Sequence, residues 1–404
     1  MEDKQFSEKE LMNAVREMSE KFTSKRRAIH DYLSSRLHVE AYTWFYHPTN
    51  QPKLEWLLKK LPRPILEQMS KGVFFDIGSG PGTYAYAVSE MAENGILPNL
   101  PQLCLIETSA LMREKARHLH LTHYNYVPSI NFLKSLPNGA DQIPMYKTAF
   151  FGNSLNEMGV KKGLEYIKKL SPELLLIIEP GTKEFFEAFL SLRQELLETN
   201  WDVLFPCQNS SFCPLTRDPR DWCHSVIHPQ FDPEIHRRMQ LVGIDRRTLP
   251  FMGAIFTKVQ NGLASHETGN YKKVNQSEEN DRKKLEKHEN TISTDKVILK
   301  EDKGSGLNSD IISHHVTALV LRKLYSNKGE IAFLICFINH DTSAHPIHKI
   351  GKAIFQKRNY SKKRLKDLEN LYAGSEFLAT RLLWKEEELK VLDFELVRTH
   401  SGTV

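Results

Sequence analysis

The N-terminal 70 residues carry apolar side chains at the three- and four-residue spacing of an amphipathic helix. The series is Leu11, Val15, Met18 and Phe22. This periodicity predicts a helical region over residues 1–70. The basic run Lys25-Arg26-Arg27 follows the series. An exposed helix face explains that run more simply than an RNA contact does.

From Val73 onward, short apolar runs alternate with segments of helical period. The predicted strands are residues 73–77, 103–107, 148–152 and 174–179. Residues that follow each run have helical spacing, as in the segment from Tyr84 to Met91. Strands that alternate with helices indicate an α/β fold with a parallel, doubly wound sheet. We assign this domain to residues 71–259.

The character of the chain changes again after residue 259. Residues 260–310 are polar, charged and nearly free of aromatic side chains, which predicts a disordered linker or insertion. Residues 316–322 and 330–338 then form two strand-like runs around a turn. A basic helix is predicted over residues 357–371. The segment 311–404 is therefore expected to be a small β-rich domain.

Composition narrows the possible environments and partners. The chain has 404 residues with 40% hydrophobic and 26% charged side chains, and its net charge is +5. That charge is compatible with RNA binding, and no DNA partner is expected. No apolar run approaches the ~20 residues of a membrane span, so no membrane partner is expected. The acidic first ten residues argue against a mitochondrial presequence. We expect a cytoplasmic protein, with the mitochondrial matrix as the alternative if the source is eukaryotic.

A glycine-rich loop follows the first predicted strand and precedes a helix. Its sequence is Asp76-Ile-Gly78-Ser-Gly80-Pro-Gly82. Glycines allow the backbone to turn tightly and to approach a ligand without Cβ clashes. A dinucleotide fold would prefer G-x-G-x-x-G, whereas the spacing here resembles motif I of class I S-adenosylmethionine-dependent methyltransferases. That resemblance implies cofactor contacts from Asp76, Gly78, Gly80 and Gly82, and from Glu107, which ends the second strand.

Polar residues also follow the later strands. The segment after residue 152 offers Asn153, Asn156 and Glu157 as candidate catalytic residues, and strand-end capping explains them equally well. Glu179-Pro-Gly-Thr182 either borders the cleft or forms a turn. The Asn-Pro-Pro-Tyr motif of amino-methylating enzymes is absent. Whether the protein is an enzyme stays open on this ground.

Three of the five cysteines fall in the turn-rich segment 205–225. They are Cys207, Cys213 and Cys223. With no secretory signal in the sequence, clustered thiols favour metal binding over disulfides. Their spacings match neither zinc fingers nor the common ferredoxin runs. A fourth ligand would come from Cys336, with Cys104 and His224 as alternatives. Spacing alone leaves zinc and iron–sulfur open.

Together these motifs resemble the methyltransferase-like small-ribosomal-subunit proteins of bacteria and mitochondria. The specific elements are Cys213-Pro-Leu and Asp221-Trp-Cys-His224. The resemblance implies a Rossmann-like class I methyltransferase fold and a possible S-adenosylmethionine site.

The same resemblance implies a structural [4Fe-4S] cluster on four cysteines. These are Cys207, Cys213, Cys223 and Cys336. It also implies binding to rRNA of the small subunit, in ribosome assembly or translation. The alternative is an active rRNA methyltransferase with a structural zinc site. A radical enzyme that uses both cluster and cofactor is disfavoured, because the C-x₃-C-x₂-C run is missing.

Overall fold

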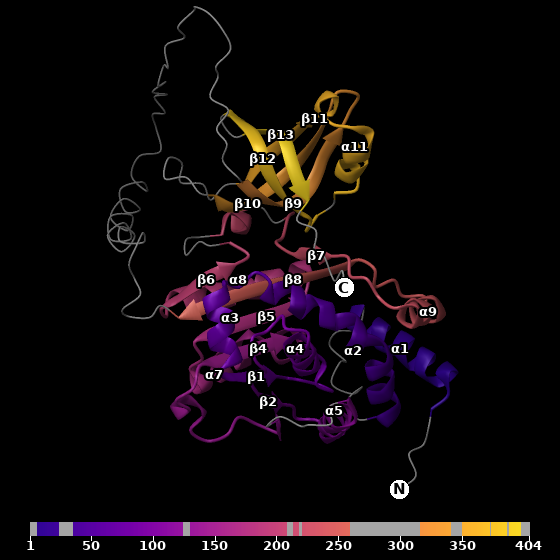
Figure 1. Cartoon of the computed structure of the whole chain (residues 1–404), viewed down its shortest axis with the longest axis vertical. Coiled ribbons are helices and arrows are strands. Elements are labelled where there is room, and N and C mark those ends of the chain that lie inside the picture. The colour runs from indigo at the N-terminus through magenta and orange to yellow at the C-terminus, as the bar shows by residue number, and fades with distance from the viewer. Residues whose placement is uncertain are drawn as a thin grey trace, which may run out of the picture. The chain divides into compact units, whose positions relative to one another are not determined.

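The structure is a computed structural model that covers most of the chain (Figure 1). It describes residues 6–23, 35–123, 130–207, 213–217, 220–258, 316–340, 350–371, 373–385 and 388–396. The predicted linker at 260–310 and the basic run at residues 25–27 lie outside these residues.

The described chain alternates helices and strands up to residue 258 and is mostly strand after residue 315. The helices are α1 (Glu8–Thr23), α2 (Arg36–Leu58), α3 (Arg63–Ser70), α4 (Thr83–Glu93), α5 (Ala110–His123), α6 (Leu155–Met158), α7 (Val160–Leu170), α8 (Lys183–Leu197), α9 (Pro233–Val242) and α11 (Lys362–Glu369). The strands of the first part are β1 (Val73–Ile77), β2 (Gln102–Ile106), β3 (Ile130–Leu133), β4 (Lys147–Gly152), β5 (Leu174–Pro180), β6 (Trp201–Phe205), β7 (Ser225–Ile227) and β8 (Leu249–Lys258). Those of the second part are β9 (Val316–Ser326), β10 (Glu330–His340), β11 (Ile350–Gln356), β12 (Glu376–Lys385) and β13 (Glu388–Leu396).

The first part is built on one sheet with the order β3-β2-β1-β4-β5-β8-β6, and β7 pairs with β8 (Figure 1). The strands β1 to β5 pair in parallel, as the alternation of strands and helices predicts. β8 runs antiparallel to β5, β6 and β7, so the sheet is parallel from β3 to β5 and antiparallel at its other edge. The α/β fold class is confirmed, and this strand order with a reversed β8 is that of class I methyltransferases.

The sheet has a hydrophobic layer on each face. Successive side chains of β1 point to opposite faces. Phe75 therefore packs with the residues of α7 and α8, whereas Phe74 packs with those of α2 and α4. Both rings are buried. Burial of this many aromatic and aliphatic side chains stabilises the fold by about 1.5–3 kcal/mol for each large side chain.

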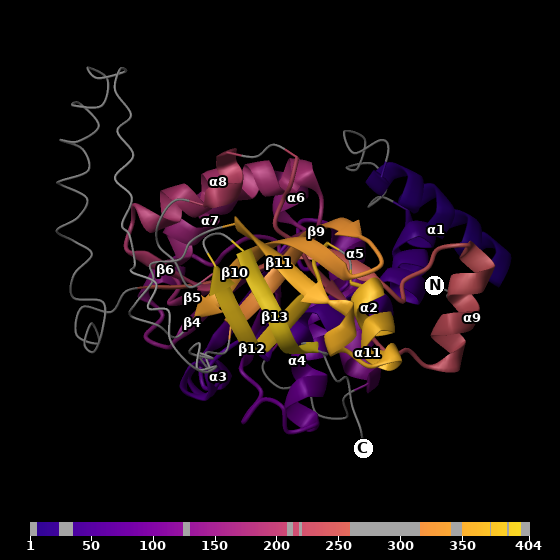
Figure 2. The same cartoon turned by 90° about the horizontal axis from the view of Figure 1, so that it is seen from above.

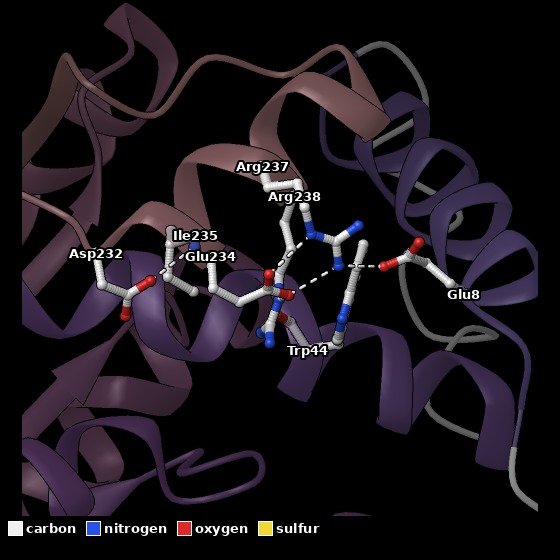
Figure 3. A network of polar contacts seen from close by, with 7 residues as sticks. All are labelled: Glu8, Trp44, Asp232, Glu234, Ile235, Arg237 and Arg238. Carbon is white, nitrogen blue, oxygen red and sulfur yellow. Dashed lines mark hydrogen bonds and ion pairs between the residues drawn. The ribbon is translucent and has the colours of Figure 1, made fainter.

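Helix α2 crosses the domain and contains two prolines, Pro48 and Pro52. A proline inside a helix has no N–H to donate to the carbonyl four residues earlier. The carbonyl of Trp44 is the one that Pro48 leaves free, and it accepts a 2.8 Å hydrogen bond from Arg238 Nη1 of α9 (Figure 3). The prolines thus create an attachment point for a distant helix.

Helix α9 lies beside α1 (Figure 2) and begins at a capped N-terminus. Asp232 accepts a 2.8 Å bond from the N–H of Ile235, which satisfies one free donor of the first turn. Arg237 bridges Glu234 of its own helix and Glu8 of α1 (Figure 3). Water screens these exposed ion pairs, so the buried apolar contacts between the helices contribute more to stability.

The second part is a closed five-stranded barrel with the strand order β10-β11-β13-β12-β9. β11 and β13 pair in parallel, and the other neighbours pair antiparallel. Helix α11 lies between the third and fourth strands along the chain, next to the barrel in both views (Figures 1 and 2). This connectivity is that of the OB-fold. The predicted β-rich C-terminal domain is confirmed, and the helix predicted over 357–371 is shorter, beginning at Lys362.

The barrel packs on the methyltransferase-like part through apolar and polar contacts. Leu319 and Leu321 of β9 belong to the same buried cluster as the core residues of the sheet. Arg322 forms a 3.1 Å ion pair with Asp221. The N–H of Val226 in β7 donates a 3.0 Å hydrogen bond to the carbonyl of Gly374. Through these contacts the barrel and the methyltransferase-like part form one compact unit.

Candidate functional site

The glycine-rich loop joins β1 to α4 and has three residues with positive φ. These angles are +75° at Gly78, +55° at Gly80 and +78° at Gly82. A Cβ on Gly78 would lie 2.5 Å from the Cβ of Ser154, in the segment after β4. The loop therefore needs glycine for both conformation and space, as the motif predicts.

Glu107 connects the end of β2 to this loop. Its Oε2 accepts a 2.9 Å hydrogen bond from the N–H of Gly80, and its Oε1 accepts a 2.7 Å bond from the N–H of Ser109. The side chain is only 6% exposed. The structure thus brings together the loop and the acid that the motif pairs with it. Their role in cofactor binding stays a prediction.

Asp76 lies at the base of the same loop and is 1% exposed. Among the described residues, neither of its carboxylate oxygens is in good hydrogen-bond geometry with a donor, although the backbone N–H of Ala85 is near enough to affect its pKa. Burial raises the pKa of Asp76 to about 8, the backbone N–H of Ala85 opposes the rise, and Glu107 adds to it. A buried acceptor without a donor is costly, so the site suits a ligand that brings a donor group.

The segment after β4 places the predicted candidates at different positions. Asn153 has φ +58°, and its Nδ2 donates a 3.1 Å hydrogen bond to the hydroxyl of Tyr84 in α4. Asn156 contributes its backbone N–H to Glu179, at 3.3 Å. Burial raises the pKa of Tyr42, and the negative charge of Glu157 raises it further. Asn153 is thus the candidate linked to the helix that follows the glycine loop.

Glu179 has a structural task at the end of β5. Its Oε1 accepts from the N–H groups of Ser154 and Leu155 at 2.8 and 2.7 Å, at the start of α6. It is fully buried, and burial raises its pKa to about 8. The following residue Gly181 approaches Phe251 so closely that a Cβ would lie 2.8 Å from its nitrogen. The Glu-Pro-Gly-Thr segment therefore forms a tight, internally bonded turn.

Helix α2 presents a buried polar face that periodicity does not predict. Its members are His47, Thr49, Asn50 and Lys53. His47 Nδ1 lies 3.2 Å from the hydroxyl of Thr83, the first residue after the glycine loop. Burial lowers the pKa of His47 to about 3. The signal available in the sequence was the run of polar residues around two prolines, from His47 to Lys53.

Four cysteines share a second region. Cys223 is buried, and Cys207, Cys213 and Cys336 are half-buried. Burial is the largest cause of the raised pKa of Cys223, and the charges of the other three thiols raise this pKa further. Cys207 and Cys213 likewise add to the raised pKa of Cys336 in β10. The structure therefore places these four thiols within electrostatic range of one another, across more than 100 residues of sequence.

The two other candidate ligands lie elsewhere or have other partners. Burial alone raises the pKa of Cys104 to about 12, in strand β2. His224 stacks on Trp222, and its Nε2 lies 3.1 Å from the carbonyl oxygen of Ala373. Across the part of the chain that the structure describes, no three His, Cys, Asp or Glu side chains are arranged as a metal site.

Comparison with protein families identifies one match. The family model described as mitochondrial small ribosomal subunit Rsm22 matches residues 36–276, which is more than half of the chain. No curated protein matches. Within the described residues, no helix is long and apolar enough to cross a membrane.

Similar solved structures are methyltransferases and related proteins of low sequence identity. A magnesium protoporphyrin IX methyltransferase from Synechocystis is 9% identical with a TM-score of 0.32, and the match covers 62% of this chain and 100% of that one. A precorrin 8w decarboxylase from Methanobacterium thermoautotrophicum is 17% identical with a TM-score of 0.30, covering 51% and 90%. A protein assigned as an RNA methyltransferase from Pyrococcus horikoshii is 11% identical with a TM-score of 0.31, covering 52% and 84%.

Proposed function

Because the chain belongs to the Rsm22 family of mitochondrial small ribosomal subunit proteins, we propose that it is a methyltransferase-like protein that binds rRNA of the small subunit. It acts in ribosome assembly or translation. The family match is the observation that carries this proposal. The family's description also favours the mitochondrial matrix over the cytoplasm, which were the two locations left open by the sequence.

The barrel supports an RNA partner. OB-folds bind oligonucleotides on the face of their second and third strands and on the adjoining loops. Here part of that face is taken, because Leu334 and Cys336 of β10 pack on the methyltransferase-like core. The free part lies toward the β9–β10 turn. Its Tyr325 ring has Lys352 Nζ 5.2 Å from its centroid, and Lys323 is exposed nearby in β9.

Exposed basic residues continue beyond that face. They are Lys328, Arg358, Lys362, Lys363 and Lys366. Phosphate contacts by such side chains make affinity fall steeply with salt. An aromatic ring among them allows stacking with a base, which contributes about 1–3 kcal/mol. The combination suits single-stranded RNA.

The cysteine set supports a resident metal group. We propose that Cys207, Cys213, Cys223 and Cys336 hold a [4Fe-4S] cluster, with zinc as the alternative. Four thiols fit either group in number and donor type. Burial raises the pKa of Cys223 and Cys336, and a bound cation would act in the opposite direction, because it favours the thiolate forms. When bound, the group supplies a structural link between the Cys segment and the barrel.

The glycine loop supports S-adenosylmethionine as a cofactor. Asp76 would accept from its amino group, and Glu107 would accept from its ribose hydroxyls. The unpartnered oxygens of Asp76 favour this view over a loop retained only for its turn. A second candidate function, an active rRNA methyltransferase, rests on the same observation. Asn153 would then face the methyl acceptor.

Two measurements test the proposal. Purified protein is mixed with small subunits, large subunits and tRNA, and association is followed by sedimentation. We expect association with small subunits only, weakening with salt, and equal binding to all three would refute the assignment. Anaerobic purification with iron, sulfide and zinc assays tests the metal. About four irons and four sulfides support the cluster, whereas about one zinc supports the alternative.

A further inference from the structure

Two basic side chains, Lys53 of helix α2 and Arg246, have no carboxylate partner among the described residues; Lys53 is buried and Arg246 is half-buried. Lys53 is 5% exposed. Among the described residues, its Nζ has no hydrogen bond or ion pair, and its nearest recorded contact is the Phe251 ring, 6.0 Å from nitrogen to centroid. The buried Nε of Arg246 also has no hydrogen-bond partner in the described chain. Buried charges normally persist only when paired, so both positions need an explanation.

The two cations belong to one site. Arg246 Nη2 donates a 2.7 Å hydrogen bond to Asn50 Oδ1, and Asn50 lies three residues before Lys53 on the same helix face. Burial lowers the pKa of Lys53 well below its usual range, and the positive charge of Arg246 lowers it further, so the two side chains lie near one another. Asn50 therefore orients Arg246 toward the neighbourhood of Lys53.

The carboxyl group that acts on Lys53 does not neutralise both side chains. Glu179 acts electrostatically on Lys53. However, its oxygens already accept from the N–H groups of Ser154, Leu155 and Asn156. No ion pair joins Glu179 to either cation in the described residues. The site thus has donors and positive charge in excess.

The site extends from β8 toward α4, the helix that follows the glycine loop. Phe251, beside Lys53, is in β8 and pairs with Pro180 of β5. The order β1-β4-β5-β8 puts three strand spacings between the loop end of β1 and Phe251. At about 4.8 Å per spacing, the separation across the sheet is about 14 Å. Phe251 therefore lies away from the loop across the sheet, whereas Arg246 is close enough to Tyr84 of α4 for their charges to interact.

We propose that Lys53 and Arg246 form a binding site for a phosphate group of an RNA acceptor. The inference deepens the proposed function and rests on it. A phosphate group has several oxygens and can accept from both side chains at once, and the planar guanidinium of arginine matches its geometry. The tyrosines beside the pair, Tyr46 and Tyr84, would line the path of the adjoining nucleotide.

The test uses the full chain and inorganic phosphate as the probe, with S-adenosylhomocysteine measured separately. Calorimetric titrations compare wild type with Lys53→Met and Arg246→Met. Lys59→Met is the matched control, because it removes the same charge from an exposed site that is paired with Glu55. We expect phosphate affinity to fall at least tenfold in the first two variants and to stay unchanged in the control. S-adenosylhomocysteine affinity should stay unchanged in all three.

Thermal melting without ligand distinguishes a binding role from a structural one. Removal of an unpartnered buried charge should leave the melting temperature of Lys53→Met equal to or above that of wild type. A lower melting temperature with unchanged phosphate affinity would overturn the proposal. A loss of S-adenosylhomocysteine affinity instead would assign the pair to the cofactor and would also overturn it. Neither result affects small-subunit association, which tests the proposed function independently.

Discussion

Lys60, just beyond the end of α2, forms a 2.7 Å ion pair with Glu376 of the barrel. Glu376 is almost enclosed, with a side chain 5% exposed, whereas that of Lys60 is 21% exposed. Lys60 Nζ also lies 4.4 Å from the centroid of the Trp56 ring. The buried carboxylate of the barrel is thus neutralised by a lysine that follows helix α2 of the methyltransferase-like part.

We expect Lys60→Met to destabilise the protein by about 2 kcal/mol, because it leaves Glu376 buried and unpaired. The cost should be below the about 3–5 kcal/mol of a fully enclosed pair, because water reaches Lys60. Denaturant unfolding measures the change. Adding Glu376→Gln to Lys60→Met should recover most of the loss. If the double variant is as unstable as the single one, packing and not charge joins the two parts here.

Glu107→Ala is expected to weaken S-adenosylmethionine binding by at least tenfold. The change removes the acceptor that the N–H groups of Gly80 and Ser109 share, so both loops lose their common anchor. Calorimetry on the purified protein checks it. Glu114→Ala serves as the control, because Glu114 is exposed on α5. Equal affinity in the two variants would show that the loop does not bind this cofactor.

The glycine loop and its sheet could be predicted because each depends on local pattern. Three glycines with positive φ follow an apolar strand, and the acid of β2 meets them through ordinary parallel pairing. The strand β8 was not predicted from its own pattern, and an apolar run alone does not give the direction of a strand. The remaining barrel strands were missed too, since β11 to β13 mix polar and apolar residues without a clear alternation.

The polar site at α2 could not be predicted from the sequence either. Lys53 and Arg246 are separated by nearly half the chain, and only the crossing of α2 over the sheet edge joins them. The proximity of the cysteines, in contrast, could be predicted. The residue type and clustering of Cys207, Cys213 and Cys223 indicated a shared site with Cys336, and in the structure the four thiols are close enough to affect one another's pKa. Metal binding by them stays a prediction.

Stability should fall as pH rises from about 4 to about 8, in part because of Asp76. Its pKa in the folded protein is raised to about 8, from 3.8. Between these values the folded state holds a proton that the unfolded state has lost, so each pH unit costs about 1.4 kcal/mol per such group. Chemical denaturation at several pH values measures the slope. Asp76→Asn should flatten it, and an unchanged slope in that variant would exclude Asp76 as its source.

Cys336→Ser is expected to loosen the barrel and to lower the metal content of anaerobically purified protein. A ligand from β10 would connect the barrel to the segment with Cys207 and Cys223. The free energy of metal binding would then stabilise the fold, and the loss of this ligand would remove that stabilisation. Limited proteolysis and metal assays measure both effects. Cys104→Ser provides the control, because only burial affects that thiol. Identical metal content and cleavage in wild type and Cys336→Ser would argue against a role for Cys336 as a ligand.

Gly374→Ala should destabilise the junction between β7 and the barrel. Gly374 has φ +88°, and a Cβ there would lie 2.5 Å from Val226 Cγ2 and 2.8 Å from His224. Gly243, at the end of α9, has φ +72° and open space around its Cβ position. Both alanine variants bear the left-handed cost of about 1 kcal/mol, and only Gly374→Ala adds the clash. We expect it to be the less stable variant by about 1–3 kcal/mol in denaturant unfolding. An equal loss of stability in the two variants would mean that the backbone at Gly374 moves to relieve the clash. The hydrogen bond from the N–H of Val226 to the carbonyl of Gly374 would then not hold the barrel in place.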